Sequence, residues 1–116
     1  EFTDPDCPYC RKAFDYFNDR DDVTKYVFLL PLTNLHPQAE AKVRYVFDAE
    51  DPVKAYKEAM SGALDQKDFS GRTFSEKANS RLAEHKSIAA KSAVSSTPTF
   101  WINGQFVPGA DIKKFN

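Results

Sequence analysis

The spacing of apolar residues changes repeatedly along this chain, and the first third has the pattern of a strand, a helix and a strand. Phe2-Thr3 has the character of a strand end. The apolar positions that follow recur at helical spacing: Cys10, Ala13, Phe14 and Phe17. After the polar run NDRDD, residues 23–30 (VTKYVFLL) end in a run of apolar residues, as a strand buried on both faces does. This order predicts a right-handed βαβ unit.

The middle third has the apolar spacing of helices. One helical stripe follows residue 37: Ala39, Val43, Val46 and Phe47. Asp51-Pro52 predicts an N-cap followed by a first-turn proline, and Gly62 can end that helix. Thr73 with Glu76 forms a possible capping box for a further helix that runs to about Ala93.

The last third returns to strand spacing. Residues 99–102 (TFWI) and 105–107 (QFV) flank Asn103-Gly104, which is a strong signal for a tight β-hairpin. Asp111 could then cap a short final helix. Together these patterns predict an α/β chain with a helical insertion, at about residues 37–92, between the βαβ unit and a C-terminal β-hairpin.

Composition narrows the class of protein further. A chain of 116 residues with 41% hydrophobic residues is long enough for one core, so we expect a single domain over 1–116. The net charge of −1 comes without a basic cluster, which argues against nucleic acid as a partner and against an anionic membrane surface. The longest apolar run is far shorter than a membrane span. No signal-peptide pattern opens the sequence, so the compartment cannot be read from its start.

The two cysteines carry the candidate chemistry. Cys7 and Cys10 lie about one helical turn apart, and a disulfide closing so small a ring would stabilise the fold by only about 2 kcal/mol. Pro8 suits the first helical position, so Cys7 should lie exposed at the helix N-terminus and Cys10 sheltered inside it. There the helix dipole should lower the pKa of Cys7 below its usual value of about 8.5, although Asp4 and Asp6, expected to be solvated, oppose this.

Two other interpretations of the cysteine pair are considered. The thiols could be ordinary core residues, or they could form half of a zinc site. Zinc usually takes four ligands, and the remaining candidates, His36 and His85, are far apart in the sequence with no second ligand near either. A CxxC pair alone is a moderate signal, and the βα context around it favours redox chemistry.

Three segments together resemble a known family. They are FTDPDCPYC with its helix, the insertion that opens at LHPQAEA, and SSTPTFWINGQFVPG. With these segments in this order, the chain resembles a thioredoxin-fold protein, and more narrowly the catalytic domain of the periplasmic disulfide isomerases DsbC and DsbG. The chain departs from that family in having no cysteine for a second, structural disulfide, and in having Ser96 where a glycine commonly precedes Thr-Pro.

The resemblance implies a role for each matching residue. Cys7 would be the attacking thiolate and Cys10 the resolving thiol. Thr97-Pro98 would form a cis-proline loop that faces the CxxC pair, with the Thr97 backbone free to pair with an extended substrate strand. The candidate substrate-binding residues are Pro8, Tyr9, Ser96, Thr97 and Pro98; no metal site is expected.

The implied activity is thiol–disulfide interchange. We expect a protein disulfide isomerase or reductase that works through a mixed disulfide without a cofactor. Its partners would be protein substrates with disulfides or thiols and a membrane-bound thiol reductase. The expected compartment is the periplasm, with a homodimer formed through an N-terminal domain that lies outside this segment. Two alternatives of another kind are a non-catalytic, chaperone-like peptide-binding module and a thiolate metal carrier.

Overall fold

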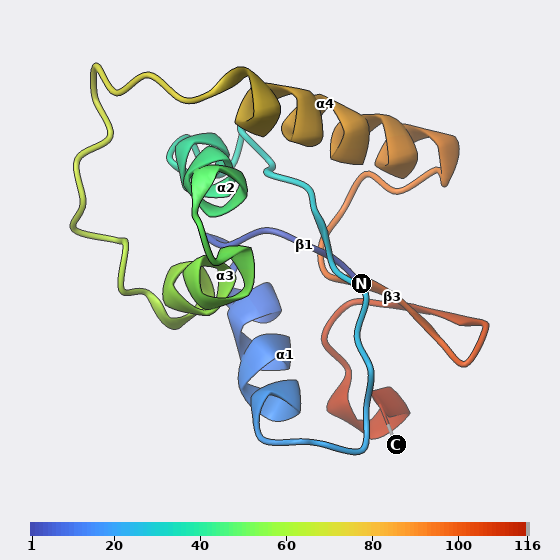
Figure 1. The fold of residues 1–116 in the computed structure, drawn as a ribbon. Coiled ribbons are helices and arrows are strands. Elements are labelled where there is room, and N and C mark those ends of the chain that lie inside the picture. The colour runs from blue at the N-terminus through green and yellow to red at the C-terminus, as the bar shows by residue number, and fades with distance from the viewer. Residues whose placement is uncertain (116) are drawn as a thin grey trace.

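The computed structural model describes residues 1–115; Asn116, the last residue of the predicted domain, lies outside them. The order of elements along the chain is the α/β order that the sequence predicts, with three helices between the second and third strands (Figure 1). The elements are β1 (Phe2–Thr3), α1 (Pro8–Asn18), β2 (Phe28–Leu29), α2 (Ala39–Asp48), α3 (Pro52–Ser61), α4 (Glu76–Lys91), β3 (Thr99–Ile102), β4 (Gln105–Pro108) and the 3-10 helix η1 (Ile112–Phe115).

The strands form one mixed sheet in the order β2-β1-β3-β4. β1 is parallel to β2, with Phe2 opposite Phe28, and antiparallel to β3, with Phe2 opposite Thr99. β3 and β4 form the predicted hairpin, and both turn residues have positive φ: 52° at Asn103 and 83° at Gly104. Positive φ at both central positions is typical of a type I′ turn, so the Asn-Gly prediction is confirmed.

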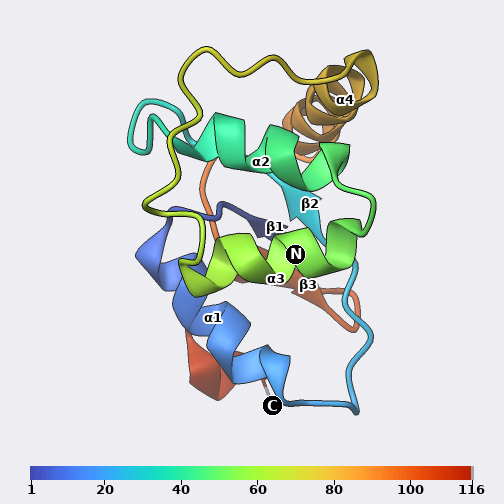
Figure 2. The same cartoon turned by 60° about the vertical axis from the view of Figure 1, so that its left-hand side comes forward.

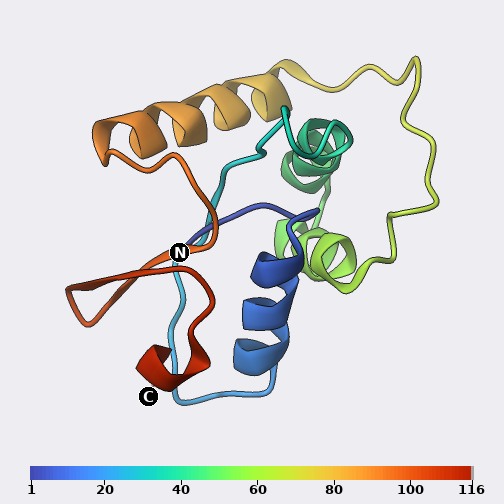
Figure 3. The same ribbon diagram turned by 180° about the vertical axis from the view of Figure 1, so that it is seen from behind.

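Helices cover both faces of the sheet (Figures 1 and 3). On one face, Ala89 and Val94, at and beyond the end of α4, pack with Phe2 of β1. On the other face, Ala13 of α1 and Phe115 of η1 enclose residues of the hairpin. α2 and α3 continue the core past the β2 edge, where Leu29 joins a cluster built from α2, α3 and α4 (Figure 2). β1 therefore runs through the centre of the molecule and leads straight to the cysteines.

The second strand is much shorter than the sequence predicts. Only Phe28–Leu29 is strand within the expected range 23–30. The backbone amides of Phe28 and Leu30 donate to the carbonyls of Glu1 and Thr3, and the N-terminal amine of Glu1 donates to the Tyr26 carbonyl, each at 2.8 Å. The register of β1 and β2 pairs Phe2 with Phe28 and Thr3 with Leu29. A strand needs a neighbour for its backbone groups, so an apolar run without one stays irregular.

Helix boundaries in the insertion follow the sequence with one correction. Asp51 accepts a hydrogen bond from the Lys54 amide as the N-cap of α3, and Gly62 ends that helix with φ 89°, both as predicted. The cap of α4 is not Thr73: Ser75 accepts from the Ala78 amide. The helix ends at Lys91 with Ser92 as its C-cap, close to the predicted end at about Ala93. Serine next to the first helical residue places its hydroxyl within reach of the free amides, whereas residue 73 lies too far upstream.

None of the helices in the described part of the chain is both long and apolar enough to cross a bilayer.

Candidate active site

The N-terminus of α1 positions both cysteines. Cys7 is the N-cap residue, with extended backbone at φ −79° and ψ 120°, and Pro8 takes the first helical position. The Cys7 amide donates to the Asp4 carbonyl at 3.1 Å, which fixes the loop that leads from β1. No side chain caps this helix and no acidic residue occupies its first turn, so its amides are left to the sulfur of Cys7.

The expectation that Cys7 is exposed is wrong. Both cysteines are free thiols, and only 5% of Cys7 and 0% of Cys10 is exposed. Both cysteines belong to a buried cluster with Phe14 and Met60, and the Cys7 thiol donates to the Thr97 carbonyl at 3.7 Å. Sequence spacing could not predict this cover, because Thr97 lies ninety positions away along the chain. Cys7 is therefore the one residue of the cysteine pair with any surface accessible to solvent.

The pKa values of the two thiols are moved in opposite directions. A hydrogen bond from the Cys10 thiol lowers the pKa of Cys7 from 9.0 to about 6, against the effect of burial, with further help from the backbone amides of Cys10 and Tyr9 and from Thr97. The same thiol–thiol bond, together with burial, raises the pKa of Cys10 far above its usual range. The predicted direction for Cys7 is confirmed, but the Cys10 thiol contributes more than the helix amides do.

The loop before β3 forms the opposite wall. The Thr97–Pro98 peptide bond is cis, as the resemblance implied. Pro98 is buried and its carbonyl accepts from the Gly109 amide at 2.8 Å, while the Ser96 carbonyl accepts from the Thr99 hydroxyl at 2.8 Å. The fold thus brings Cys7, Cys10 and Thr97 together.

The other predicted contact residues lie outward. Pro8 and Ser96 are exposed, and Tyr9 is 66% exposed. The structure gives none of these three side chains a contact with the sulfurs. They are placed where a bound chain could reach them, since each belongs to a segment that flanks Cys7 or Thr97.

The acidic residues before Cys7 are not solvated as expected. Asp4 is completely buried, where it accepts hydrogen bonds from the amides of Asp6 and Leu32 at 2.8 Å and faces His36 Nδ1 at 3.0 Å. A buried carboxylate is stable only when its oxygens are satisfied in this way. Asp4 therefore fixes the loop between β1 and α1, and His36 is its side-chain partner.

An ionic network that the sequence did not reveal ties the motif to the insertion. Arg11 donates to Asp65 at 2.7 and 2.9 Å, and its Nε donates to the Pro5 carbonyl at 2.7 Å. Lys42 of α2, with a side chain only 6% exposed, bonds to Asp65 at 2.7 Å and also to Asp6. Hydrogen bonds from Arg11 are the first cause that holds the pKa of Asp65 well below its usual range. The one sequence signal was Lys42, a charged residue inside an apolar helical stripe.

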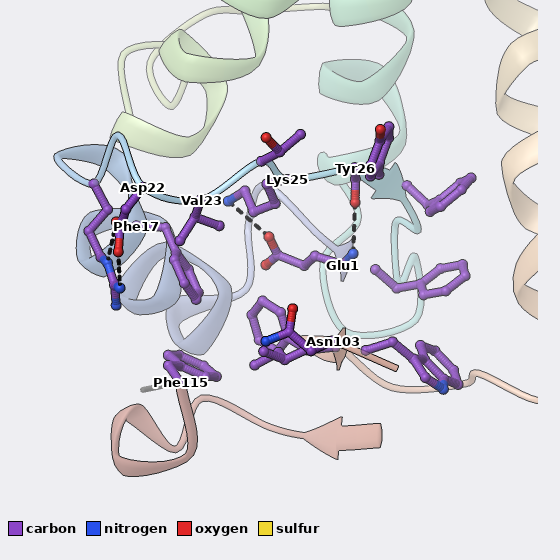
Figure 4. Close-up of a pocket in the computed structure, with 15 residues that line it drawn as sticks. Glu1, Phe17, Asp22, Val23, Lys25, Tyr26, Asn103 and Phe115 are labelled. Carbon is purple, nitrogen blue, oxygen red and sulfur yellow. Dashed lines mark hydrogen bonds and ion pairs between the residues drawn. The ribbon is translucent and has the colours of Figure 1, made fainter. Parts of the chain in front are cut away.

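A separate cavity lies away from the sulfurs (Figure 4). Its volume is about 680 Å³, and residues 22–26, the ends of β1 and β3, and Phe115 line it, but neither cysteine does. Glu1 and Lys25 meet inside it at 3.0 Å. The cavity borders the segment that fails to form strand. Among residues 1–115, no cluster of three or more His, Cys, Asp or Glu residues is arranged to hold a metal ion.

Comparisons with known proteins agree with this geometry. A family model described as a thioredoxin-like domain matches residues 1–113. A crystal structure of a disulfide interchange protein from Neisseria gonorrhoeae is 31% identical, with a TM-score of 0.75. The match covers 93% of this chain and 74% of that one.

Curated relatives are longer than this chain. A probable thiol:disulfide interchange protein DsbC from Bordetella pertussis is 41% identical over 59 residues, which is 51% of this chain and 20% of that protein. The thiol:disulfide interchange protein DsbC of Salmonella typhimurium is 29% identical over 111 residues, which is 93% of this chain and 44% of that protein. The matched region is thus less than half the length of either relative.

Proposed function

The chain belongs to the thioredoxin-like family and, within it, to the DsbC-like disulfide interchange proteins, and from this premise we propose that it is a thiol–disulfide oxidoreductase acting on protein substrates. The observation that carries the proposal is the opposite shift of two thiols in one motif. The pKa of Cys7 is lowered to about 6, and that of Cys10 is raised. A pair of ordinary core thiols would have both values raised by burial.

The reaction begins with the Cys7 thiolate. It attacks a substrate disulfide, forms a mixed disulfide and releases one substrate thiolate. In reduction, the Cys10 sulfur then attacks Cys7, the Cys7–Cys10 bond forms, and the second substrate sulfur leaves with the proton from Cys10. In isomerisation, a freed substrate thiolate attacks elsewhere in the substrate, and Cys7 is regenerated as the thiolate. Neither route requires a cofactor.

Substrate contacts are assigned to the exposed residues around the sulfurs. Pro8 and Tyr9 project from the first turn of α1, and Ser96 precedes the cis-proline loop. We assign them, with Thr97 and Pro98, to binding an extended substrate segment, because such a segment can pair with backbone groups and place its disulfide beside Cys7. The high exposure of Tyr9 supports this assignment, since an aromatic ring gains most from being covered by a partner.

Three further proposals concern the compartment, the redox partner and the oligomeric state, and they rest on the likeness to the longer relatives. We place the protein in the periplasm, where a membrane-bound thiol reductase would keep Cys7 and Cys10 reduced for isomerisation. We also propose a homodimer that forms through a region outside these 116 residues. The segment alone should then reduce disulfides but isomerise scrambled substrates poorly; equal isomerase rates for the segment and a longer, dimeric form would contradict this.

Insulin reduction tests the proposal directly. The reduced chain should accelerate insulin reduction by dithiothreitol, and Cys7→Ser should abolish that acceleration. Cys10→Ser should instead accumulate a mixed disulfide between Cys7 and an insulin chain, visible by non-reducing electrophoresis. The proposal fails if Cys7→Ser retains the activity. It also fails if the wild-type chain binds peptides or metal tightly through this region but reduces nothing, which would indicate a binding module or a metal carrier.

A further inference from the structure

A buried hydroxyl beside the cysteines has no role in the scheme above. Thr3 of β1 is completely buried, and its Oγ1 makes no hydrogen bond of acceptable geometry in the structure. Its backbone pairs with β2, so the residue is held rigidly. The hydroxyl nevertheless lies close enough to Cys10 to favour the thiolate form of that residue. It is a donor placed next to a sulfur that is protonated in the reduced protein.

A purely structural residue at this position would not need the hydroxyl. Valine has nearly the same shape as threonine, suits a strand better than most residues, and would leave no buried polar atom unsatisfied. Thr99 of the neighbouring strand offers a contrast, since it is also buried but its hydroxyl donates to the Ser96 carbonyl. Two buried threonines of one sheet thus differ in whether their hydroxyls are already used.

The resolving step creates the need for such a donor. While Cys7 is held in a mixed disulfide, it can no longer accept the hydrogen bond from the Cys10 thiol. Cys10 must then carry negative charge inside the protein, where burial opposes ionisation. A hydroxyl that is already positioned and unpaired can rotate toward the new anion without breaking another bond.

We propose that the Thr3 hydroxyl donates a hydrogen bond to the Cys10 sulfur as that sulfur becomes the nucleophile that resolves the mixed disulfide. This inference rests on the proposed function and deepens it. Atoms and electrons balance within the step: the Cys10–Cys7 bond forms, the Cys7–substrate bond breaks, and the proton of Cys10 ends on the departing substrate sulfur. Thr3 keeps its own proton throughout.

Other titratable groups face the same space and must be considered with Thr3. Cys7 is the N-cap of the helix that contains Cys10, and Tyr56 of α3 packs against the buried cluster to which both thiols belong. Burial, with Glu1 and Cys10 nearby, raises the pKa of Tyr56, so its ring stays neutral. The Glu1 carboxylate is also within reach of the Thr3 hydroxyl, and the same carboxylate forms an ion pair with Lys25. Glu1 is thus a competing acceptor for the Thr3 hydroxyl. The Thr97 hydroxyl, which is also buried and unpaired, is a second donor within reach of Cys10, so the sulfur-specific readouts below are necessary.

A chromogenic mixed disulfide separates the two chemical steps. When the reduced protein is mixed with Ellman's reagent, attack by Cys7 releases one thionitrobenzoate, and attack by Cys10 on Cys7 releases the second. We expect Thr3→Val to slow the second release about tenfold or more at pH 7, the change equivalent to a charge-assisted hydrogen bond, while the first release is unchanged. Thr3→Ser should restore the second release to within a few-fold of wild type.

Thr99→Val is the matched control. It removes a buried hydroxyl from the same sheet, and we expect it to lower the melting temperature without raising the pKa of Cys10. Thr3→Val should do the reverse: it should keep or raise the melting temperature, and it should raise the pKa of Cys10 measured in the Cys7→Ser background. If Thr3→Val folds poorly, Thr3→Ala provides a second variant that lacks the hydroxyl.

Three results would overturn the inference. They are an unchanged second release in Thr3→Val, slowing of both releases in parallel, and a Thr3→Ser variant as slow as Thr3→Val. None of these would touch the proposed function, which fails only if Cys7 itself proves dispensable.

Discussion

Two helices of this molecule begin in opposite ways. α4 starts with an ordinary cap, in which the Ser75 hydroxyl accepts from the Ala78 amide and Glu76 follows in the first turn. α1 starts with Cys7, which provides no side-chain cap, and its first turn has no acidic residue. The first arrangement satisfies the helix amides permanently, whereas the second leaves them directed at a sulfur that can gain or lose charge.

The comparison shows that the N-terminus of α1 lacks the stability that a side-chain cap gives to α4. α1 lacks the stabilisation of a cap, and other contacts hold its start in place: the satisfied Asp4 carboxylate, and the network of Arg11 and Lys42 with Asp6 and Asp65. The amides remain available to the Cys7 thiolate. Each prediction below tests a part of this contrast, beginning with the largest effect.

The two thiols of α1 should differ greatly in reactivity. At pH 7, iodoacetamide should modify Cys7 at least on the order of 100-fold faster than Cys10, since one is largely thiolate and the other a buried thiol. Peptide mapping by mass spectrometry after short exposures measures both rates. Equal modification of the two residues would show that the N-terminus of α1 does not discriminate between them.

Removing the buried ammonium should loosen the start of α1. We expect Lys42→Met to lower the free energy of unfolding by about 2 kcal/mol, because it removes the buried cation and leaves Asp6 and Asp65 paired only with the more exposed Arg11. Urea unfolding of the reduced protein measures this. Arg44→Met on the same helix removes a more exposed charge that pairs with Glu40, and it should cost less than about 1 kcal/mol. Similar losses in both variants would mean that the network contributes nothing specific.

The stability of the reduced protein should depend on the charge of Cys7. The pKa of Cys7 is lowered from 9.0 to about 6 on folding, so its thiolate stabilises the fold fully above pH 9, and this contribution is lost as the pH falls through 6. Because the sulfur is partly screened, we expect a gain of about 2 kcal/mol between pH 5 and 9.

Cys7→Ser provides the reference for that measurement. Urea unfolding of both proteins between pH 5 and 9 should show that the free energy of unfolding of wild type increases relative to that of the variant as the pH rises. A serine cap on α1 would add a constant difference but no pH dependence. If the free energies of unfolding of the two proteins changed in parallel with pH, the Cys7 thiolate would make no contribution to stability.

The smallest effect concerns the capped helix. Ser75→Ala should lower the free energy of unfolding by about 1 kcal/mol, whereas Thr73→Ala should change it very little. Thermal unfolding at a single pH is sufficient, because neither residue titrates. The reverse order of the two losses would restore the capping box that the sequence suggested.

Local signals were enough for much of the fold. Asn103-Gly104 specified the hairpin, Asp51-Pro52 and Gly62 bounded α3, and the period of the apolar residues located α1 and α2. The failure at residues 23–30 has a physical cause, since a strand depends on a partner that no local pattern encodes.

The site was predictable in its residues but not in its environment. The motif identified Cys7 and Cys10, and the resemblance added Thr97-Pro98. The burial of Cys7 under Thr97, the burial of Asp4 and the Lys42 network all arise from contacts between distant segments. Such contacts decide pKa values, and sequence spacing alone does not supply them.

Titration of the Cys7 thiolate tests the central claim most directly. The absorbance of the reduced protein at 240 nm, followed from pH 4 to 10 with Cys7→Ser subtracted, reports how much of Cys7 is ionised. The account predicts a midpoint near pH 6, and a higher midpoint in Cys10→Ala, which lacks the main hydrogen-bond donor. A wild-type midpoint near pH 9, the value of an ordinary thiol, would contradict it.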